Sequence, residues 1–219
     1  MKIECRTQQE LETALATANE QTELYLFGDL LMQTNKGMRI IVMGKAHPAI
    51  IVWGQSITII ESCEESTPHI ECWDGSSPRI ITRAYSKPTI QAQRSSRPEI
   101  ITYNYSRADI VAKGAAEIKT FDLSKPHVTI SDEAKPDILT WDDSRPIIEC
   151  LDTSSPRIVV NDRSYPLVIG VMDADPQVTC LGSYNPVIMQ RGFWSMLFRG
   201  EIALAISQLY RSKMRKLNS

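Results

Sequence analysis

The chain has 219 residues, 42% of them hydrophobic, which is enough to bury a core as one globular domain. Its 24 basic and 26 acidic residues give a formal net charge of -2, which excludes a global attraction to nucleic acid or to an anionic membrane. The first residues lack the apolar region of a secretory signal, and no run of 18 apolar residues could span a membrane. We therefore expect a cytoplasmic protein without a membrane partner.

The N-terminal segment, residues 1–36, carries a helix signal and then a strand signal. The sequence 7–10, Thr-Gln-Gln-Glu, is a capping box, and the residues after it place an apolar stripe on one helical face. That stripe consists of Leu11, Ala14, Leu15 and Ala18. Alternation then predicts a first strand through Leu24, Leu26, Gly28 and Leu30. We expect the helix to cover the coil that contains this strand.

Residues 37–190 form a tandem array, in which an Ile or Val anchor recurs sixteen times between Ile40 and Ile188, at a spacing of ten and once of eight. From its anchor the unit reads I-x-[small]-x-[D/G/N]-x-[S/A]-x-P-x, as in residues 138–147. The specified residues all lie at even offsets, and side chains on a strand alternate between its two faces. The array therefore predicts strands with an inside and an outside.

The turn residues and the single short unit support this interpretation. Asp and Ser can accept backbone N–H groups that a bend leaves unpaired, Gly tolerates positive φ, and Pro fixes φ at the strand entrance. Each Asp is expected to cap its own corner. The short unit, from Ile110 to Ile118, loses two residues, so the inward and outward faces are preserved beyond it.

Alternation between successive units indicates how many of them make one coil. The second inward position carries threonine in every other unit, at Thr82, Thr102, Thr120 and Thr140. Like residues recur every twenty residues, so two units with opposed strands should form each coil. The predicted fold is all-β, a parallel β-solenoid of ten-residue repeats with two repeats per coil, an N-terminal capping helix and a C-terminal helix.

The C-terminal segment, residues 191–219, has the pattern of an amphipathic helix. Its apolar stripe contains Ile202, Ile206, Leu209 and Tyr210. Two interpretations stay open: a lid on the last coil, or a helix through which two copies form a homodimer.

The unit resembles the short tandem repeats of the A-T-V-x-A-x-[D/G]-S kind found in actinobacterial and phage-associated proteins, which are expected to form β-helices. The stretch 108–115, ADIVAKGA, is closest to that pattern, whereas the other units have two added residues and a regular Pro. The helix leading into residues 24–27 also resembles the start of right-handed parallel β-helix proteins, a family that includes polysaccharide lyases and hydrolases. None of their catalytic motifs can be placed here.

The strongest candidate binding surface is an outward aromatic row beside an outward aliphatic row, because a soluble rod seldom exposes a contiguous apolar stripe without a use for it. The two rows recur in every other unit and consist of Tyr103, Phe121 and Trp141, with Ile81, Ile101, Leu139 and Val159. A terminal segment folded over this face is the alternative. Trp53 and Trp73 should form a smaller pair on the opposite side.

Other polar groups have structural interpretations. The carboxylate row of Asp122, Asp132, Asp142, Asp152 and Asp162 could serve a glycosidase, but corner capping explains it better. No catalytic triad can assemble from His47, His69 and His127. We expect the cysteines to fill space in the core as small apolar residues. A row of basic residues precedes the prolines, and we interpret it as solvated charge at the edge of the rod. The row consists of Lys87, Arg97, Arg107, Lys125, Lys135 and Arg145.

We therefore predict a non-enzymatic interaction protein of phage or mobile-element origin, which binds a host protein through the aromatic face, and inhibition of that host protein would fit this interpretation. No cofactor, metal or nucleic acid is expected. A self-assembling filament protein and a carbohydrate-active enzyme using the Asp row are the alternatives.

Overall fold

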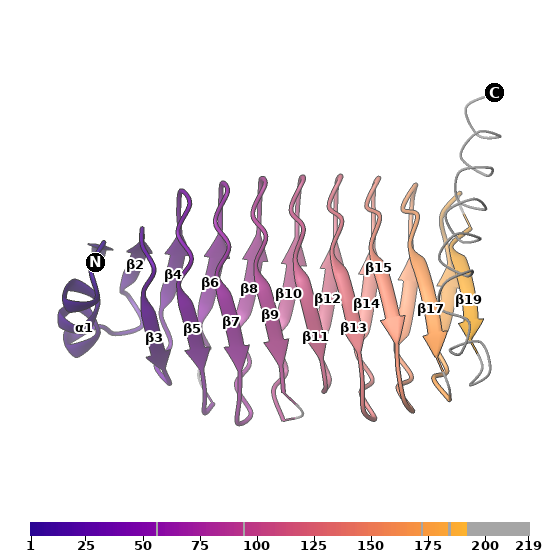
Figure 1. The fold of residues 1–219 in the computed structure, drawn as a ribbon, viewed down its shortest axis with the longest axis horizontal. Coiled ribbons are helices and arrows are strands. Elements are labelled where there is room, and N and C mark those ends of the chain that lie inside the picture. The colour runs from indigo at the N-terminus through magenta and orange to yellow at the C-terminus, as the bar shows by residue number, and fades with distance from the viewer. Residues whose placement is uncertain (56, 94, 172, 184, 192–219) are drawn as a thin grey trace, which may run out of the picture.

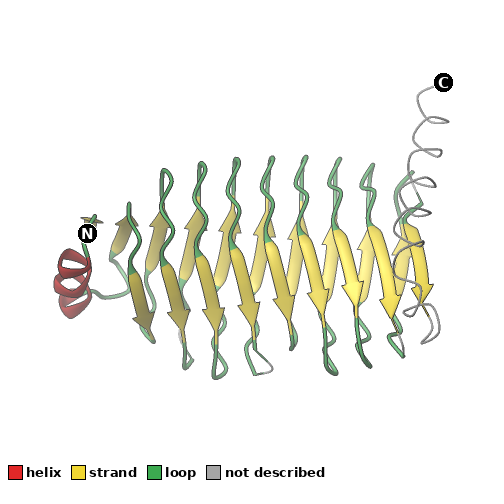
Figure 2. Cartoon of the chain, viewed as in Figure 1, coloured by secondary structure: helices red, strands yellow, loops and turns green. Residues whose placement is uncertain are grey.

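The computed structural model describes residues 1–191 apart from residues 56, 94, 172 and 184. The chain winds as a parallel β-solenoid of about nine turns, and its strands face one another in two sheets along a rod (Figure 1). Strands and corners alternate along nearly the whole rod, and one helix lies at its N-terminal end (Figure 2). The predicted fold class is confirmed.

The first sheet has ten strands in the order β1-β2-β4-β6-β8-β10-β12-β14-β16-β18. Their bounds are β1 Lys2–Cys5, β2 Glu23–Leu26, β4 Arg39–Val42, β6 Ile59–Ser62, β8 Arg79–Thr82, β10 Glu99–Thr102, β12 Glu117–Thr120, β14 Asp137–Thr140, β16 Arg157–Val160 and β18 Gln177–Cys180.

The second sheet has nine strands in the order β19-β17-β15-β13-β11-β9-β7-β5-β3. Their bounds are β3 Leu31–Thr34, β5 Ala49–Val52, β7 His69–Cys72, β9 Thr89–Ala92, β11 Asp109–Ala112, β13 His127–Ile130, β15 Ile147–Cys150, β17 Leu167–Val171 and β19 Val187–Arg191. Consecutive strands alternate between the sheets from β2 onward, so each coil contains two repeats, as the threonine pattern predicts.

The register of the strands keeps every anchor above the anchor of the preceding coil. Ile100 pairs with Ile80 on one side and with Ile118 on the other, although the eight-residue unit lies between Ile100 and Ile118. Because that unit removes an even number of residues, the side chains beyond it keep their faces. The predicted conservation of inside and outside is confirmed.

In the central coils the residues at offsets zero, two, six and eight point into the rod, whereas the turn residue at offset four of the ten-residue units is exposed or half-buried, so the predicted inward side is wrong at that position. The anchors of the central coils, such as Ile60, Ile100 and Ile138, are completely buried. The threonine column is also buried, and it is paired with serines of the next coil: Thr82 Oγ1 donates to Ser106 Oγ at 3.0 Å. The pairs Thr102–Ser124, Thr120–Ser144 and Thr140–Ser164 repeat this contact at 3.1, 3.0 and 2.7 Å. A line of hydroxyl groups therefore runs beside the hydrocarbon core.

Each corner is a tight turn that also hydrogen-bonds to the next coil. The N–H of Ser144 donates to the carbonyl of Trp141 at 3.2 Å and closes the turn, while the N–H of Arg145 donates to Ser124 of the preceding coil at 3.0 Å. The fourth residue after the anchor has positive φ in most units, for example 55° at Asp142. Asp and Asn adopt this left-handed conformation more readily than most residues. The serine hydroxyls face inward, so the expectation that they accept the N–H groups of the bend is wrong for the paired serines.

The N-terminal end is covered by α1, Gln8–Thr17. The predicted capping box is present, with Thr7 accepting from the N–H of Glu10 at 3.3 Å and Glu10 accepting from the N–H of Thr7 at 3.1 Å. Leu11 and Ala14 are buried against the core. The strand before this helix, β1, is absent from the sequence prediction, and the predicted strand through Leu30 ends at Leu26.

The last described coil differs from those before it. Ile188 is 53% exposed and Leu181 is 70% exposed, whereas the anchors from Ile40 to Val168 are buried. The stripe predicted at Ile202, Ile206, Leu209 and Tyr210 lies outside the described residues. Within the described part of the chain, no helix is both long and apolar enough to cross a membrane.

Candidate binding surfaces

The outer face of the first sheet carries the aromatic row that the sequence predicts. Tyr103, Phe121 and Trp141 follow β10, β12 and β14, and their rings stack along the rod. Ring centroids are 5.1 Å apart between Tyr103 and Phe121 and 4.8 Å apart between Phe121 and Trp141, with interplanar angles of 15° and 2°. All three side chains are half-buried. We call these three residues the aromatic ladder.

The aliphatic row beside the aromatic ladder is less exposed than the sequence suggests. Ile81 is 8% exposed and Ile101 is 2% exposed. Leu139 and Val159 are half-buried. The predicted stripe is therefore accessible at the aromatic ladder, Leu139 and Val159, and the expectation that Ile81 and Ile101 are exposed is wrong.

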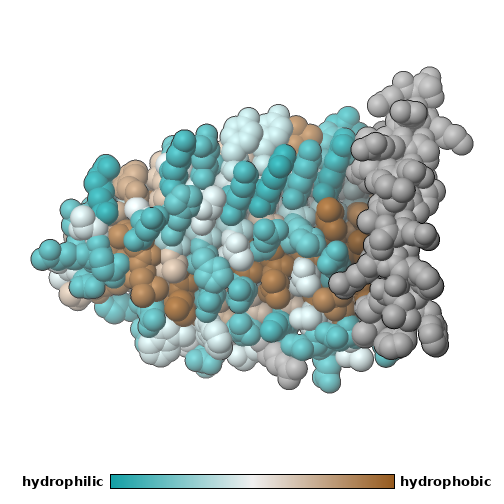
Figure 3. Space-filling view, in the orientation of Figure 1, coloured by the Kyte–Doolittle hydropathy of each residue, from teal (hydrophilic) through white to brown (hydrophobic). Residues whose placement is uncertain are grey.

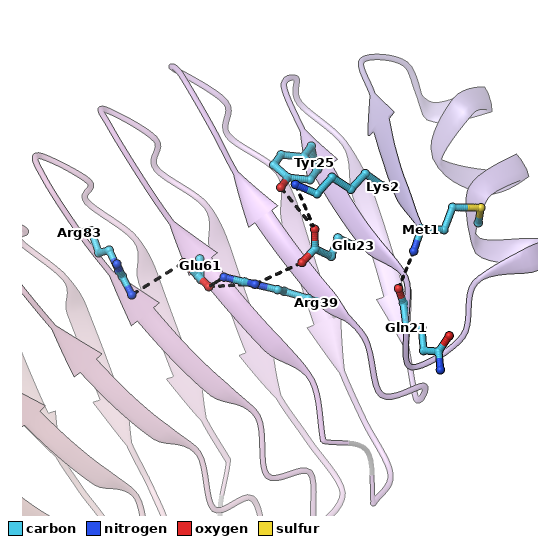
Figure 4. Close-up of polar contacts among 8 residues, drawn as sticks. All are labelled: Met1, Lys2, Gln21, Glu23, Tyr25, Arg39, Glu61 and Arg83. Atoms are coloured by element: carbon cyan, nitrogen blue, oxygen red, sulfur yellow. Dashed lines mark hydrogen bonds and ion pairs between the residues drawn. The ribbon is translucent and has the colours of Figure 1, made fainter.

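The N-terminal part of the same face is occupied by a chain of charges (Figure 4). Arg39 donates to Glu61 at 3.0 Å and pairs with Glu23 at 3.2 Å, and its hydrogen bond with Glu61 raises the pKa of the guanidinium. Arg83 lies 4.0 Å from Glu61 and also sits over the ring of Tyr103, 5.7 Å from its centroid. These charged side chains therefore pair with one another. Their row reaches Arg83, which contacts Tyr103, the first residue of the aromatic ladder.

The carboxylate row is part of the backbone scaffold. Asp122, Asp142 and Asp162 lie at successive corners after the first sheet, whereas Asp132 and Asp152 lie at corners after the second. Oδ2 of Asp142 accepts from the N–H of Asp122 in the preceding coil at 3.3 Å, and Asp152 does the same for Asp132 at 3.0 Å. The prediction that each Asp caps its own corner is wrong for Asp122, Asp142 and Asp152, because their carboxylates accept from the preceding coil. No cluster of three metal-ligating side chains occurs among the described residues.

The histidines are dispersed, as the spacing predicts. His69 on β7 contacts Glu71 at 2.9 Å, and this contact together with a 2.8 Å hydrogen bond from Trp73 lowers the pKa of Glu71. His127 on β13 lies 3.8 Å from Asp109 and 3.7 Å from Glu149. The order of the second sheet separates these histidines by three coils. Trp53 and Trp73, on this same sheet, are 43% and 41% exposed.

The cysteines divide by their place in the rod. Cys72 and Cys150 are completely buried, and burial raises the pKa of each thiol to about 12. They are the small apolar fillers that the sequence predicts. Cys180 occupies the same position in its unit but is exposed, so the filler interpretation is wrong for it.

Sequence reasoning missed a groove along the corners that follow the first sheet. It is a hollow of about 430 Å³ lined by Glu65, Thr67, Tyr85, Lys87, Tyr105, Arg107, Leu123 and Lys125. The tyrosine rings stack with centroids 5.3 Å apart. The signal was present in the sequence, because the fifth position after the anchor is Tyr85, Tyr105 and Leu123 in alternate units. Figure 3 shows hydrophilic side chains in parallel rows along the upper part of the rod, where these corners lie.

The fold and these surfaces place the chain in the structural class of β-solenoids. No protein family, no curated protein and no solved structure matches it.

Proposed function

We propose that this β-solenoid is a non-enzymatic binding protein that holds another protein against the aromatic ladder. The observation that carries the proposal is the stack of Tyr103, Phe121 and Trp141, with adjacent ring centroids about 5 Å apart on a continuous sheet. Half-buried aromatic side chains provide contact area at a low entropic cost, and they are enriched among residues that dominate protein interfaces. The resemblance of the unit to phage-associated repeats motivates a host protein as the partner.

The surroundings of the ladder support protein binding. The neighbouring charges Lys119, Glu99 and Glu117 form ion pairs with one another, with Lys119 2.6 Å from Glu99 and 2.9 Å from Glu117. A partner would therefore meet an apolar centre beside charges that are already compensated, which is the arrangement of an interface core and its polar rim.

The alternatives have weaker support. Carboxylates of the Asp row already accept backbone N–H groups, which makes them structural acceptors. Helix α1 covers the N-terminal coil, so head-to-tail stacking into a filament would have to displace it. Light scattering of the purified protein tests the filament directly, because a polymer would scatter far more than a monomer or dimer.

The test of the proposal compares two double variants. Phe121→Ala with Trp141→Ala removes the ladder, whereas Trp53→Ala with Trp73→Ala removes two exposed tryptophans from the opposite sheet. A partner captured from host lysate is identified by mass spectrometry, purified and titrated against each variant. We expect the ladder variant to bind at least about 30-fold more weakly, as for an interface centre, and the control to bind like the parent protein. Equal affinity of the ladder variant and the parent would refute the proposal.

A further inference from the structure

We propose that the groove along the corners after the first sheet is a second binding site, and that it takes an extended acidic peptide segment of a protein partner. The site is distinct from the aromatic ladder, since it is built by the fifth and seventh residues after the anchors of β6, β8, β10 and β12. The proposal therefore stands or falls independently of the function assigned to the ladder.

The backbone fixes the side chains that line this groove. The N–H groups of Lys87, Arg107 and Lys125 each donate to a serine carbonyl of the preceding coil, at 2.9, 3.0 and 3.0 Å. Ser86, which lies between Tyr85 and Lys87, is fully buried. Because side chains alternate along an extended segment, Tyr85 and Lys87 project outward. Successive coils repeat the arrangement about every 4.8 Å. The result is a row of three cations parallel to a row of two tyrosines and a leucine.

The charge of the groove indicates an anionic occupant. None of Lys87, Arg107 and Lys125 forms an ion pair with another residue in the described part of the chain. The one acidic residue of the lining, Glu65, pairs with Lys45 at 3.5 Å. Several cations elsewhere on the rod do have a carboxylate within reach, as Arg163 has Asp143 at 2.8 Å and Arg157 has Asp137 at 2.7 Å. The groove thus concentrates positive charge on a protein whose net charge is -2.

The orientation of the tyrosines favours a peptide over a nucleic acid. Tyr85 and Tyr105 are 60% and 50% exposed, but their rings stack on each other with an interplanar angle of 10° along the rod. The ring faces that meet in this stack are therefore occupied. Ring edges carry partial positive charge and suit carboxylates, whereas nucleic-acid bases need free ring faces for stacking.

The shape of the groove requires an elongated ligand. The lining residues come from four successive coils, which span about 15 Å at the spacing of neighbouring strands. An extended peptide of about five residues has this length. Residues 211–219 do not fit the groove by charge, because they contain Arg211, Lys213, Arg215 and Lys216. An acidic segment of a partner protein has the complementary charge.

The experiment measures fluorescence anisotropy of a labelled decaglutamate peptide titrated with the intact protein. We expect saturable binding that weakens when salt is raised, because exposed charges are screened. The test variant carries Lys87→Gln, Arg107→Gln and Lys125→Gln. The matched control carries Arg97→Gln, Lys113→Gln and Lys135→Gln, which removes two lysines and one arginine outside the groove and leaves the same net charge.

The proposal expects the groove variant to bind decaglutamate at least about tenfold more weakly, while the control stays within about twofold of the parent. An equal loss in both variants would assign the binding to net charge and overturn the proposal, as would an absence of binding to the parent. A labelled decathymidylate that binds more tightly than decaglutamate would overturn the assignment to a peptide. Thermal unfolding of both variants at the parent temperature verifies that the substitutions leave the fold intact.

Discussion

The central coils and the last described coil have the same repeat pattern but bury it differently. Ile138 and Cys150 are completely buried, whereas Ile188 is 53% exposed and Cys180, at the position equivalent to Cys150, is also exposed. Central strands have a hydrogen-bonded neighbour on each side, whereas β18 and β19 each have one among the described strands. Burial in this fold is therefore conferred by the neighbouring coils rather than by the residue at a given repeat position.

The N-terminal end shows what the last coil lacks within the described residues. There Leu11 and Ala14 of α1 are buried in the same cluster as the first anchors. Among the described residues, the two ends of the core thus differ by a layer of apolar side chains that covers the N-terminal one. We therefore expect the central coils to be more stable than the last described coil.

Truncation of an anchor side chain should give the largest difference in unfolding free energy between the central coils and the last described coil. Ile100→Ala removes a completely buried side chain between two packed coils, and we expect a loss of about 2–5 kcal/mol in the free energy of unfolding. Ile188→Ala removes a side chain that is half in solvent, so we expect a loss below about 1 kcal/mol. Urea unfolding followed by circular dichroism measures both. Comparable losses in the two variants would contradict the contrast between the coils.

Much of this architecture could be predicted because the same residue pattern recurs in each repeat. The anchors, the even offsets and the alternate threonines are local and periodic, so they indicate strands, faces and two units per coil. The strand β1 could not be predicted in this way, because it lies outside the array and pairs with β2 across the helix.

The contacts between coils explain the remaining errors. That Asp142 accepts from Asp122 depends on the corner geometry of two stacked coils, which a single unit does not encode. The burial of Ile101, which is 2% exposed, is likewise not indicated by its outward position in the repeat. The groove at Tyr85 and Tyr105 was detectable at a spacing of twenty residues, but its importance comes from the cations beside it, which form no ion pair with any described residue.

Buried hydroxyl groups of the central coils provide a second comparison, between those that have a hydrogen-bond partner and those that do not, and its expected effect on stability is smaller. Thr120 Oγ1 donates to Ser144 Oγ at 3.0 Å in the interior, whereas Ser154 Oγ is buried without a hydrogen-bond partner among the described residues. Thr120→Val leaves Ser144 without this partner, and we expect it to destabilise the protein by about 1–3 kcal/mol. Ser154→Ala removes an unsatisfied hydroxyl and should be neutral or slightly stabilising.

Urea midpoints of the two hydroxyl variants decide this contrast. The double variant Thr120→Val with Ser144→Ala is the control, because it removes both partners and should recover part of the loss. A Ser154→Ala variant as unstable as Thr120→Val would show that the two hydroxyls are equivalent and that pairing does not matter.

The reactivity of the thiols should report how well the central coils and the last described coil protect their cysteines, without a change to the core. At pH 8 the exposed Cys180 should react with a thiol reagent within seconds to minutes, whereas Cys72 and Cys150 should stay protected until the protein unfolds. Burial raises the pKa of both buried thiols from 9.0 to about 12, so the folded state favours their neutral form. Their contribution to stability is complete below pH 9 and is lost as the pH rises toward 12.

Mass spectrometry of labelled peptides locates the reacted cysteines, and Cys180→Ser provides a control that should lack the fast phase. Unfolding at increasing pH, followed by the labelling of Cys150, then measures the alkaline loss. If Cys150 reacted as fast as Cys180 in the native protein at pH 8, the coil around β15 would have to open in solution. The central coils would then be no better protected than the edge, and neighbouring coils could not be the source of burial.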